Sequence, residues 1–492
     1  MILGDNMKKL SELYPGVSED VTIKAIKINS KECEPGDLFV CTMGVTADRH
    51  EFIGDAISHG ASAVVVSRDV GDIGVPVVKV PDTNRELPYL CQKFYDYPDQ
   101  KLKVLGITGT DGKTSTATIM QTLIGNDLCG YIGTNGRSCA KFTGDNPNTT
   151  PDVHLLYAYF KEFLDCGCKY VAMEASSEAF FRNRLQTIQF DLSVYTNITS
   201  EHLNIHGSFE NYVQCKEQLF KQTKKDGYCV LNMDDPYYEQ IKSICNGKVV
   251  TYGMKEDATL QIVDFKAYPT HTMIHFKYRD EVIEVDSPLL GDFNVYNLAA
   301  GLLAALCVGV SMEKALARIK NITINGRLDL LNTNTPYYVM VDYAHTPNGI
   351  TKLLNFVHTL DINRSIVVIG QAGERDYIKR PQVGEVVVKN ATHAIFTYED
   401  PRSEDPKAIC DDIVKTVKDT YHNYEIVIDR REAIQKAIDM AGEKDMVLIL
   451  GKGNETYQKL KTETIYFNDE EEAKELLISA LFLSLMGTNI GF

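Results

Sequence analysis

The chain has 492 residues, of which 44% are hydrophobic and 24% charged, and this composition is typical of a soluble globular protein. That length is too great for one hydrophobic core, so two to four domains are expected. The formal net charge of −16 argues against sequence-independent binding to nucleic acid or to an anionic membrane.

Neither end of the chain carries a pattern typical of export or membrane insertion. The first residues, MILGDNMKKLSELYPG, have acids and Pro where a signal peptide would have its apolar core. The longest apolar run, Leu476–Met486, is too short and too interrupted by Ser to span a bilayer, and we expect a packing helix there. The twelve Cys follow no disulfide or zinc spacing. These features predict a cytoplasmic protein with reduced thiols.

Short hydrophobic runs typical of buried strands alternate with helical patterns along most of the chain. Helical patterns lie between most of the runs, as at Thr114–Ile124 and Asp152–Cys166. This alternation predicts βαβ units, largely parallel sheets and an α/β fold class. The expected strands are Ser62–Ser67, Leu102–Thr108, Tyr170–Ala175, Leu192–Thr196, Tyr228–Asn232, Tyr338–Asp342, Ile366–Ile369, Ala394–Tyr398 and Met446–Leu450.

Several expected strands end in polar clusters. In open α/β sheets ligands collect at the carboxyl ends of the strands. The clusters therefore predict one large composite site to which more than one domain contributes. They read TGTDGKT, MEASSE, YTNITSEH, VDYAH, GQAGERD, YEDPR and LGKGNE.

The first cluster joins an expected strand to an expected helix and is typical of a phosphate-binding loop. Its glycines let backbone N–H groups turn toward phosphate oxygens, and the helix N-terminus adds its positive end. Lys113 would reach the phosphates, and the Thr114 hydroxyl would bind Mg²⁺. The usual pattern has a further Gly where this chain has Ile107.

The loop without that Gly resembles Thr-Gly-Thr-x-Gly-Lys-Thr of the Mur ligases, the ATP-dependent amide-forming enzymes of peptidoglycan precursor synthesis. Further blocks follow in the order of that family, and they resemble most the MurE branch. MurE enzymes add the third amino acid, a diamine, to UDP-N-acetylmuramoyl-L-alanyl-D-glutamate. The blocks are INSKECEPGDLFV, NTTPD, MEASSEAF, TNITSEHLNIHGSFENYVQCKEQLF, LGDFNVYNLAA, INGRLD, VDYAHTPNGI, GERDYIKRP and GKGNETYQ.

The resemblance implies a three-domain Mur ligase architecture. A small N-terminal α/β domain that binds UDP would cover residues 1–100. A central P-loop ATPase-like domain with a mostly parallel sheet would cover 101–329, and a C-terminal Rossmann-like domain that binds the amino acid would cover 330–492. The protein would be a monomer that binds small-molecule substrates and no nucleic acid.

The implied chemistry is the activation of a carboxylate by ATP. Phosphorylation gives an acyl phosphate, from which the amine then displaces phosphate, and Mg²⁺ and cationic side chains offset the negative charge. The resemblance implies that Lys113, Lys216, Glu174 and His202 are catalytic, and that Thr114, Glu174, His202 and Lys216 hold metal. Lys216 would be carbamylated to N6-carboxylysine, which turns a cation into an oxygen ligand. Without the family pattern it would be an ordinary solvated lysine.

The resemblance also assigns binding residues to each substrate. For ATP they are Gly109, Thr110, Asp111, Gly112, Lys113, Thr114, Ser115, Asn294, Asn297, Arg327 and Asp342. For the UDP-muramoyl dipeptide they are Ser30, Thr149, Thr150, Ser176, Ser177, Arg182 and Arg184. For the incoming amino acid they are Arg375, Asp400, Arg402, Gly451 and Glu455.

The incoming amino acid is expected to be meso-diaminopimelate. Arg402, in YEDPR, matches the Arg of the Asp-Asn-Pro-Arg motif that grips the distal carboxylate of diaminopimelate. Glu399 and Asp400 replace the usual Asp and Asn of that motif, and this more acidic pocket favours the alternative, L-lysine. Glu178, Asn204 and Asn454 also depart from the family's usual His, Asp and His.

Those three departures leave a divergent paralogue with altered substrate or weak activity as an alternative. A related amide ligase, such as folylpolyglutamate or cyanophycin synthetase, would share the nucleotide loop but lack the N-terminal uridine block and NTTP. A non-catalytic nucleotide-binding protein would not need Lys113, Glu174, His202 and Lys216.

Overall fold

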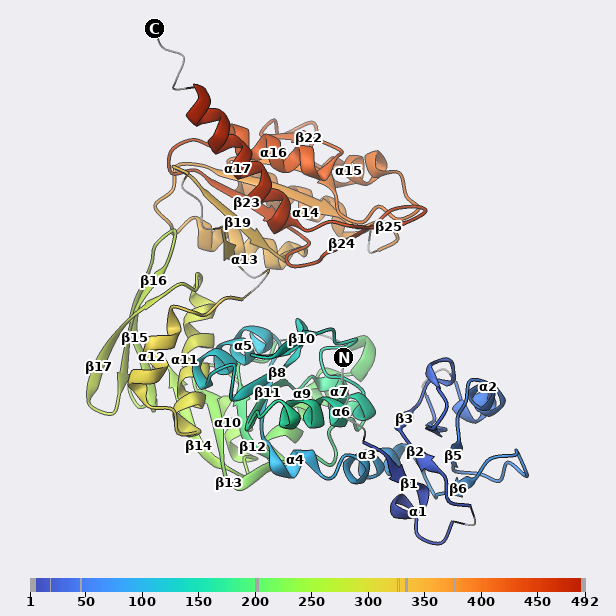
Figure 1. The fold of residues 1–492 in the computed structure, drawn as a ribbon. Coiled ribbons are helices and arrows are strands. Elements are labelled where there is room, and N and C mark those ends of the chain that lie inside the picture. The colour runs from blue at the N-terminus through green and yellow to red at the C-terminus, as the bar shows by residue number, and fades with distance from the viewer. Residues whose placement is uncertain are drawn as a thin grey trace. The chain divides into compact units, whose positions relative to one another are not determined.

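The computed structural model describes residues 6–17, 19–44, 47–199, 203–324, 326, 328–331, 335–375 and 377–487. The chain folds into two compact units. The first comprises residues 1–262, 277–282 and 296–319, and the second comprises 263–276, 283–295 and 320–492. Figure 1 labels the helices and strands of both units.

The first unit begins with a four-stranded parallel sheet. Its strands follow the chain order β3 (Ala25–Lys27), β4 (Asp37–Val40), β5 (Ala63–Val66) and β6 (Val77–Lys79). The other elements of this segment are β1 (Lys8–Lys9), α1 (Leu10–Leu13), β2 (Thr22–Ile23), η1 (Ser30–Glu32), η2 (Arg49–Phe52), α2 (Ile53–Ser58), α3 (Thr83–Phe94) and α4 (Pro98–Lys101).

An eleven-stranded sheet follows, in the order β10-β9-β8-β11-β7-β12-β13-β14-β15-β16-β17. The strands from β8 to β15 pair in parallel, and β9 and β10 add an antiparallel edge. The strands are β7 (Lys103–Thr108), β8 (Cys129–Gly133), β9 (Gly136–Cys139), β10 (Phe142–Gly144), β11 (Tyr170–Glu174), β12 (Phe190–Tyr195), β13 (Thr223–Asn232), β14 (Lys248–Gly253), β15 (Leu260–Ala267), β16 (Thr272–Tyr278) and β17 (Glu281–Ser287).

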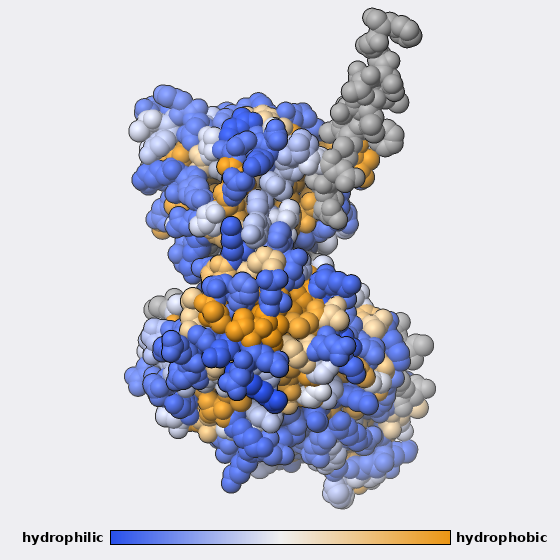
Figure 2. All heavy atoms as spheres, turned by 90° about the vertical axis from the view of Figure 1, so that its left-hand side faces the viewer, coloured by the Kyte–Doolittle hydropathy of each residue, from blue (hydrophilic) through white to orange (hydrophobic). Residues whose placement is uncertain are grey.

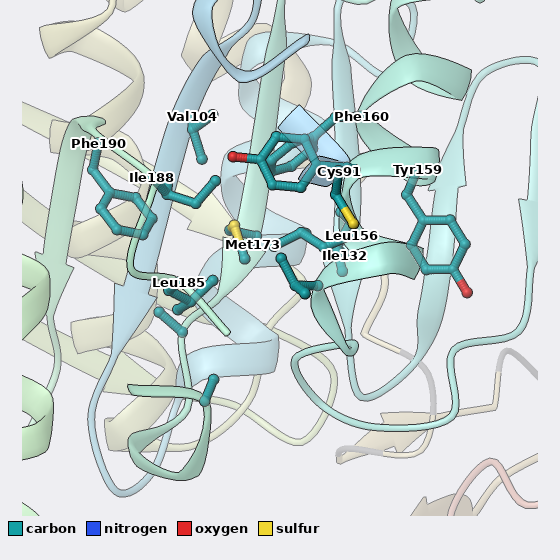
Figure 3. Packing of buried hydrophobic residues seen from close by; sticks show 14 of the residues in the cluster. Cys91, Val104, Ile132, Leu156, Tyr159, Phe160, Met173, Leu185, Ile188 and Phe190 are labelled. Carbon is teal, nitrogen blue, oxygen red and sulfur yellow. The ribbon is translucent and has the colours of Figure 1, made fainter. Parts of the chain in front are cut away.

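Helices cover this sheet because its central strands are apolar on both faces, as parallel strands are. In β7 every residue except Lys103 is buried. Figure 3 shows Leu156 and Phe160 of α6 packed in one core with Ile132 and Met173 of the sheet. The helices between these strands are α5 (Lys113–Ile124), α6 (Val153–Asp165), α7 (Ser177–Phe181), α8 (Leu203–His206), α9 (Phe209–Lys221), α10 (Tyr238–Ser243), α11 (Asp292–Cys307) and α12 (Met312–Ile319).

The second unit contains a six-stranded sheet in the order β18-β19-β23-β20-β21-β22, parallel except at β18. One core joins α13, α14 and α15 to one face, and another joins α16 and α17 to the other. The elements are β18 (Asp329–Leu330), β19 (Tyr338–Asp342), α13 (Pro347–Val357), β20 (Ser365–Gln371), α14 (Lys379–Asn390), β21 (His393–Tyr398), α15 (Pro406–Val414), β22 (Tyr424–Ile426), α16 (Arg430–Met440), β23 (Met446–Leu450), β24 (Tyr457–Lys459), β25 (Thr464–Tyr466) and α17 (Asp469–Gly487).

The predicted α/β class and largely parallel sheets are confirmed, and each of the nine expected strands is present. The apolar run near the C-terminus belongs to α17, where Leu476 and Leu477 are buried in the core. Among the described residues no helix is long and apolar enough to cross a membrane. Figure 2 shows hydrophilic residues over much of the surface on the side of β15–β17. The domain boundaries at residues 100 and 329 stay predictions.

Candidate active site

The sheet order gathers the polar strand ends at two edges. Strands β11, β7 and β12 are adjacent and parallel, so the clusters MEASSE, TGTDGKT and YTNITSEH start from the same edge of the large sheet. In the second unit β19, β23, β20 and β21 are likewise adjacent and parallel. Their clusters VDYAH, LGKGNE, GQAGERD and YEDPR follow at the carboxyl edge of that sheet.

The loop between β7 and α5 depends on two glycines. Gly112 precedes α5 with φ +84°, and a Cβ there would lie 2.4 Å from Asn297 Oδ1. A Cβ on Gly109 would lie 1.8 Å from Thr196 Oγ1. Because no side chain caps α5, its first-turn N–H groups at Lys113, Thr114 and Ser115 are left to a ligand. This arrangement fits the phosphates of a nucleotide.

Lys113 and Lys216 both donate to one backbone oxygen. Lys113 Nζ lies 2.9 Å from the Gly109 carbonyl, and Lys216 Nζ lies 2.6 Å from the same oxygen. The two cations are thus within a few ångströms of each other. Lys216 is only 1% exposed and lies over the Tyr212 ring, 4.5 Å from its centroid. Such a pair of cations favours an anion between them or the loss of one of the two charges.

Glu174 ends β11 and is also 1% exposed. Its Oε1 accepts hydrogen bonds from the Tyr131 hydroxyl and the Thr134 N–H, both at 2.9 Å, and Oε2 accepts from the Thr134 hydroxyl at 3.3 Å. A Cβ on Gly133 would lie 2.2 Å from Oε1, so this position also needs Gly. Sequence reasoning missed Tyr131, Gly133 and Thr134, since no motif marks the β8–β9 turn.

A cavity of about 200 Å³ connects the two lysines with residues expected to bind the dipeptide. Thr150 organises its wall, because its hydroxyl donates to the Glu174 carbonyl at 2.7 Å and lies 3.1 Å from Ser176 Oγ. Sequence reasoning had assigned no binding role to Asn148, Glu178, Ile205 or Tyr212. The lining residues are Lys113, Asn148, Thr149, Thr150, Ser176, Ser177, Glu178, Arg184, Ile205, Tyr212 and Lys216.

Two predicted dipeptide residues lie outside this cavity. Arg182 is exposed, and its Nε donates to Glu178 Oε1 at 2.6 Å. Ser30 starts η1 beside the N-terminal sheet, where its hydroxyl donates to Asp55 Oδ2 at 2.6 Å. Arg184, which does line the cavity, is fixed by an ion pair to Asp152 at 2.7 Å.

Three of the residues predicted to bind ATP beyond the loop, Asn294, Asn297 and Asp342, are buried and hydrogen-bonded. Asn297 Oδ1 accepts from the Thr116 hydroxyl at 3.3 Å, beside Gly112. Asn294, in the first turn of α11, donates from Nδ2 to the Leu290 carbonyl at 2.8 Å. The Asp342 carboxylate accepts from the N–H groups of Leu328 and Ala344 at 2.8 and 2.7 Å.

The predicted metal site is only partly described. Arg327 and His202 lie outside the described residues. Among those residues no group of three or more His, Cys, Asp and Glu side chains is placed to hold a metal. Thr114, Glu174 and Lys216 therefore stay predicted ligands.

In the second unit, three of the residues predicted to bind the incoming amino acid lie around a lysine that was not predicted from the sequence. Lys452 is fully buried, and its Nζ lies 3.1 Å from both Asp400 Oδ1 and Glu455 Oε2. Gly451 has φ +112°, and a Cβ there would lie 3.1 Å from Glu399 Oε2. Asp400, Gly451 and Glu455 thus lie together around Lys452.

Arg402 and Glu399 are the unusual groups of this site. Arg402 has φ +53°, and its buried Nε has no hydrogen-bond partner among the residues that the structure describes. Burial raises the pKa of Glu399 to about 7, and the nearby Arg430 and Lys452 only partly oppose that rise. Arg375 lies exposed in the loop after β20.

Models of one protein family match three successive segments of the chain. The matches are "Mur ligase family, catalytic domain" at residues 22–105, "Mur ligase middle domain" at 107–305 and "Mur ligase, glutamate ligase domain" at 326–453. The chain belongs to the Mur ligase family. The predicted family, its three-domain architecture and the ligase class are confirmed.

Curated Mur ligases are similar over nearly the whole chain. The UDP-N-acetylmuramoyl-L-alanyl-D-glutamate–2,6-diaminopimelate ligase of Clostridium perfringens is 37% identical, over 97% of this chain and 99% of that protein. The ligase of the same name from Bacillus cereus is 38% identical, over 94% of this chain and 96% of its own length.

Solved structures agree with this family assignment. A diaminopimelate ligase of the same name superposes with a TM-score of 0.71 at 26% identity, covering 96% of this chain and 99% of that one. A folylpolyglutamate synthase of Mycobacterium tuberculosis, 16% identical with a TM-score of 0.58, covers 74% of this Mur ligase and 91% of its own chain. That likeness shows a shared fold alone.

Proposed function

We propose that this Mur ligase adds meso-diaminopimelate to UDP-N-acetylmuramoyl-L-alanyl-D-glutamate in an ATP-dependent reaction through an acyl phosphate. Relatives that are 33–38% identical over nearly their whole length carry the name of that reaction. Small-molecule substrates and a cytoplasmic monomer are part of the proposal.

The cavity beside the β7–α5 loop is the observation that carries this proposal. Its lining includes Lys113, the hydroxyl-bearing residues Thr149, Thr150 and Ser177, and Arg184. Cations and hydroxyl donors suit an acceptor carboxylate and the phosphoryl group transferred to it. Thr150, Ser177 and Lys216 of its lining are buried.

The residues of the loop fit a nucleotide, and those beyond it fit Mg²⁺. Gly109 and Gly112 leave the space, and the first-turn N–H groups of α5 and Lys113 supply the positive charge. The Thr114 hydroxyl and the Glu174 carboxylate are hard oxygen ligands. Bound Mg²⁺ would neutralise charge on the phosphates. His202 is proposed to join them.

Carbamylation of Lys216 would resolve the crowding of two cations. An unmodified Lys216 lies close to Lys113, so each ammonium raises the electrostatic energy of the other. A carbamate on Lys216 would instead be an anion that attracts Lys113 and offers oxygens to a metal. We therefore propose N6-carboxylysine at position 216.

The contacts in the second unit favour diaminopimelate over lysine. Negative charge on Glu399 and Asp400 would favour lysine, but both charges are reduced. Asp400 pairs with buried Lys452, and burial keeps Glu399 partly protonated near neutral pH. Arg402 has an unsatisfied guanidinium nitrogen, which a substrate carboxylate would satisfy. We propose that Arg402 binds the distal carboxylate, and that Asp400, Gly451, Glu455 and Arg375 bind the amino-acid end.

Lys216→Ala tests the catalytic assignment. Ligation should fall by at least about 100-fold, since the change removes a group in the reacting cavity. If the lost group is a carbamate, added formate or acetate should restore part of the activity, whereas ethylamine should not. Lys221→Ala, on the same helix but in a partly exposed pair with Glu217, is the matched control and should keep full activity. Rescue by ethylamine alone would show that Lys216 acts as a cation.

A further inference from the structure

The cavity contains one carboxylate that the proposed reaction does not use. Its charged lining residues are Lys113, Arg184, Lys216, for which a carbamate is proposed, and Glu178, the sole Asp or Glu among the described lining residues. A site for a carboxylate and a phosphoryl group is weakened by a fixed negative charge, because like charges repel. The reactant that suits Glu178 is the incoming amino acid, whose amino group is mostly an ammonium at neutral pH.

Arg182 holds Glu178 from outside the cavity. Arg182 Nε donates to Glu178 Oε1 at 2.6 Å, one helical turn along, and both side chains are 37% exposed. Arg182 itself does not line the cavity. Among the described residues none hydrogen-bonds the other oxygen, Oε2 of Glu178, so it can accept a hydrogen bond from a substrate. The pair is reachable from solvent, as a carboxylate that receives the ammonium of an incoming substrate must be.

The other charged or titratable groups at this cavity come from neighbouring elements. Lys216 comes from α9, Lys113 from α5 and Arg184 from the loop after α7. His206 of α8 lies close by, with Nε2 at 3.0 Å from the Ser177 hydroxyl. The proposed reaction already assigns Lys113 to the phosphates, Lys216, as a carbamate, to the metal, and Arg184 to the dipeptide, which leaves Glu178 to take the proton of the ammonium.

We propose that Glu178, positioned by Arg182, receives the attacking amino group of the incoming amino acid and accepts one of its protons. This inference rests on the proposed function. The ammonium gives one proton to the Glu178 carboxylate. The nitrogen lone pair then forms the C–N bond with the acyl carbon as the C–O bond to phosphate breaks. The second proton leaves the nitrogen with the departing phosphate.

Hydroxylamine separates this step from acyl phosphate formation. It is a nucleophile that is mostly uncharged at pH 7, so it needs no carboxylate to take a proton before it attacks. Glu178→Gln should lower kcat/KM for the amino acid by about 100-fold, the usual contribution of a general base. The same variant should release phosphate with hydroxylamine at nearly the wild-type rate. The deficit of Glu178→Gln in kcat/KM for the amino acid, relative to wild type, should become smaller as pH rises toward 10, because the amine then loses its proton to water.

The outcomes distinguish the two proposals. If wild type forms neither product nor hydroxamate, the proposed function itself fails. If wild type is active and Glu178→Gln ligates the amino acid at the normal rate, the proposed role of Glu178 is wrong. The role is also wrong if Glu178→Gln loses phosphate release with hydroxylamine to the same extent as with the amino acid. Glu178→Asp, which keeps the carboxylate, should recover part of the activity. Equal thermal midpoints for the three proteins show that folding is unaffected.

Arg182→Ala tests the positioning role. We expect a several-fold lower kcat/KM for the amino acid, with the KM for the UDP-muramoyl dipeptide unchanged, and recovery in Arg182→Lys. A raised KM for the dipeptide with normal use of the amino acid would instead place Arg182 on the nucleotide substrate. That result would overturn the pairing with Glu178.

Discussion

Arg402 joins two unfavourable features at one residue. A non-glycine residue with φ near +53° is strained, and a buried guanidinium nitrogen that no described residue hydrogen-bonds adds the cost of its lost hydration. Strain that persists at one position is typical of a binding site, where a ligand satisfies the exposed group. The carboxylate of an amino-acid substrate is such a ligand.

Arg402→Ala should therefore lower kcat/KM for diaminopimelate by on the order of 30-fold or more, as expected for 2–5 kcal/mol lost from a buried charge pair. The KM for ATP should change little. Lysine lacks the distal carboxylate, so its use should be unchanged or slightly better. Arg431→Ala removes an exposed pair with Glu475 and is the control. Equal losses for diaminopimelate and lysine would contradict the assignment.

His154 predicts a pH dependence of stability. It is buried on α6, its Nδ1 has no hydrogen-bond partner within the described part of the chain, and burial lowers its pKa from 6.5 to about 4. The unfolded chain binds this proton at a higher pH than the folded chain does. Stability must then fall as pH falls from about 6.5 to about 4.

His154→Leu should make the melting temperature less dependent on pH between 6.5 and 4. Leucine binds no proton in either state, so position 154 no longer contributes a difference in bound protons between the folded and unfolded chains. His422→Leu, at an exposed position, should leave the wild-type slope. An unchanged slope in His154→Leu would mean that this histidine is protonated in the folded protein.

At the scale of elements, the strands and the nucleotide loop could be predicted because their signals are local. Buried parallel strands are continuous apolar runs, and Gly-Lys-Thr fixes a strand–loop–helix. The β8–β10 edge was not predicted, since short strands with Gly and Arg lack such a run. Tyr131 and Thr134 reach Glu174 only through that fold.

Gly112→Ala tests the loop against a matched position. Gly112 and Gly167 have similar φ, +84° and +89°, so Ala costs roughly 1–2 kcal/mol of backbone strain at either. Only at Gly112 would the new Cβ meet an atom, Asn297 Oδ1 at 2.4 Å. The KM for ATP should rise at least about tenfold in Gly112→Ala and stay normal in Gly167→Ala. Equal ATP kinetics in both variants would show that the loop does not hold phosphate as proposed.

At the scale of the whole molecule, the family pattern predicted the architecture and most lining residues of the cavity. It did not predict how individual charges pair. Lys452 neutralises Asp400, and Arg182 pairs with Glu178. Both contacts depend on packing that a linear pattern does not encode. Those pairings decide which charges remain for a substrate.

The central claim is the addition of diaminopimelate to UDP-N-acetylmuramoyl-L-alanyl-D-glutamate. The most direct measurement is phosphate release with ATP, Mg²⁺ and that dipeptide, with one diamine added at a time and the product identified by mass spectrometry. We predict release and a tripeptide product with meso-diaminopimelate, at a kcat/KM well above that for L-lysine. A preference for lysine would contradict the role of Arg402, and no release with either diamine would contradict the proposed reaction.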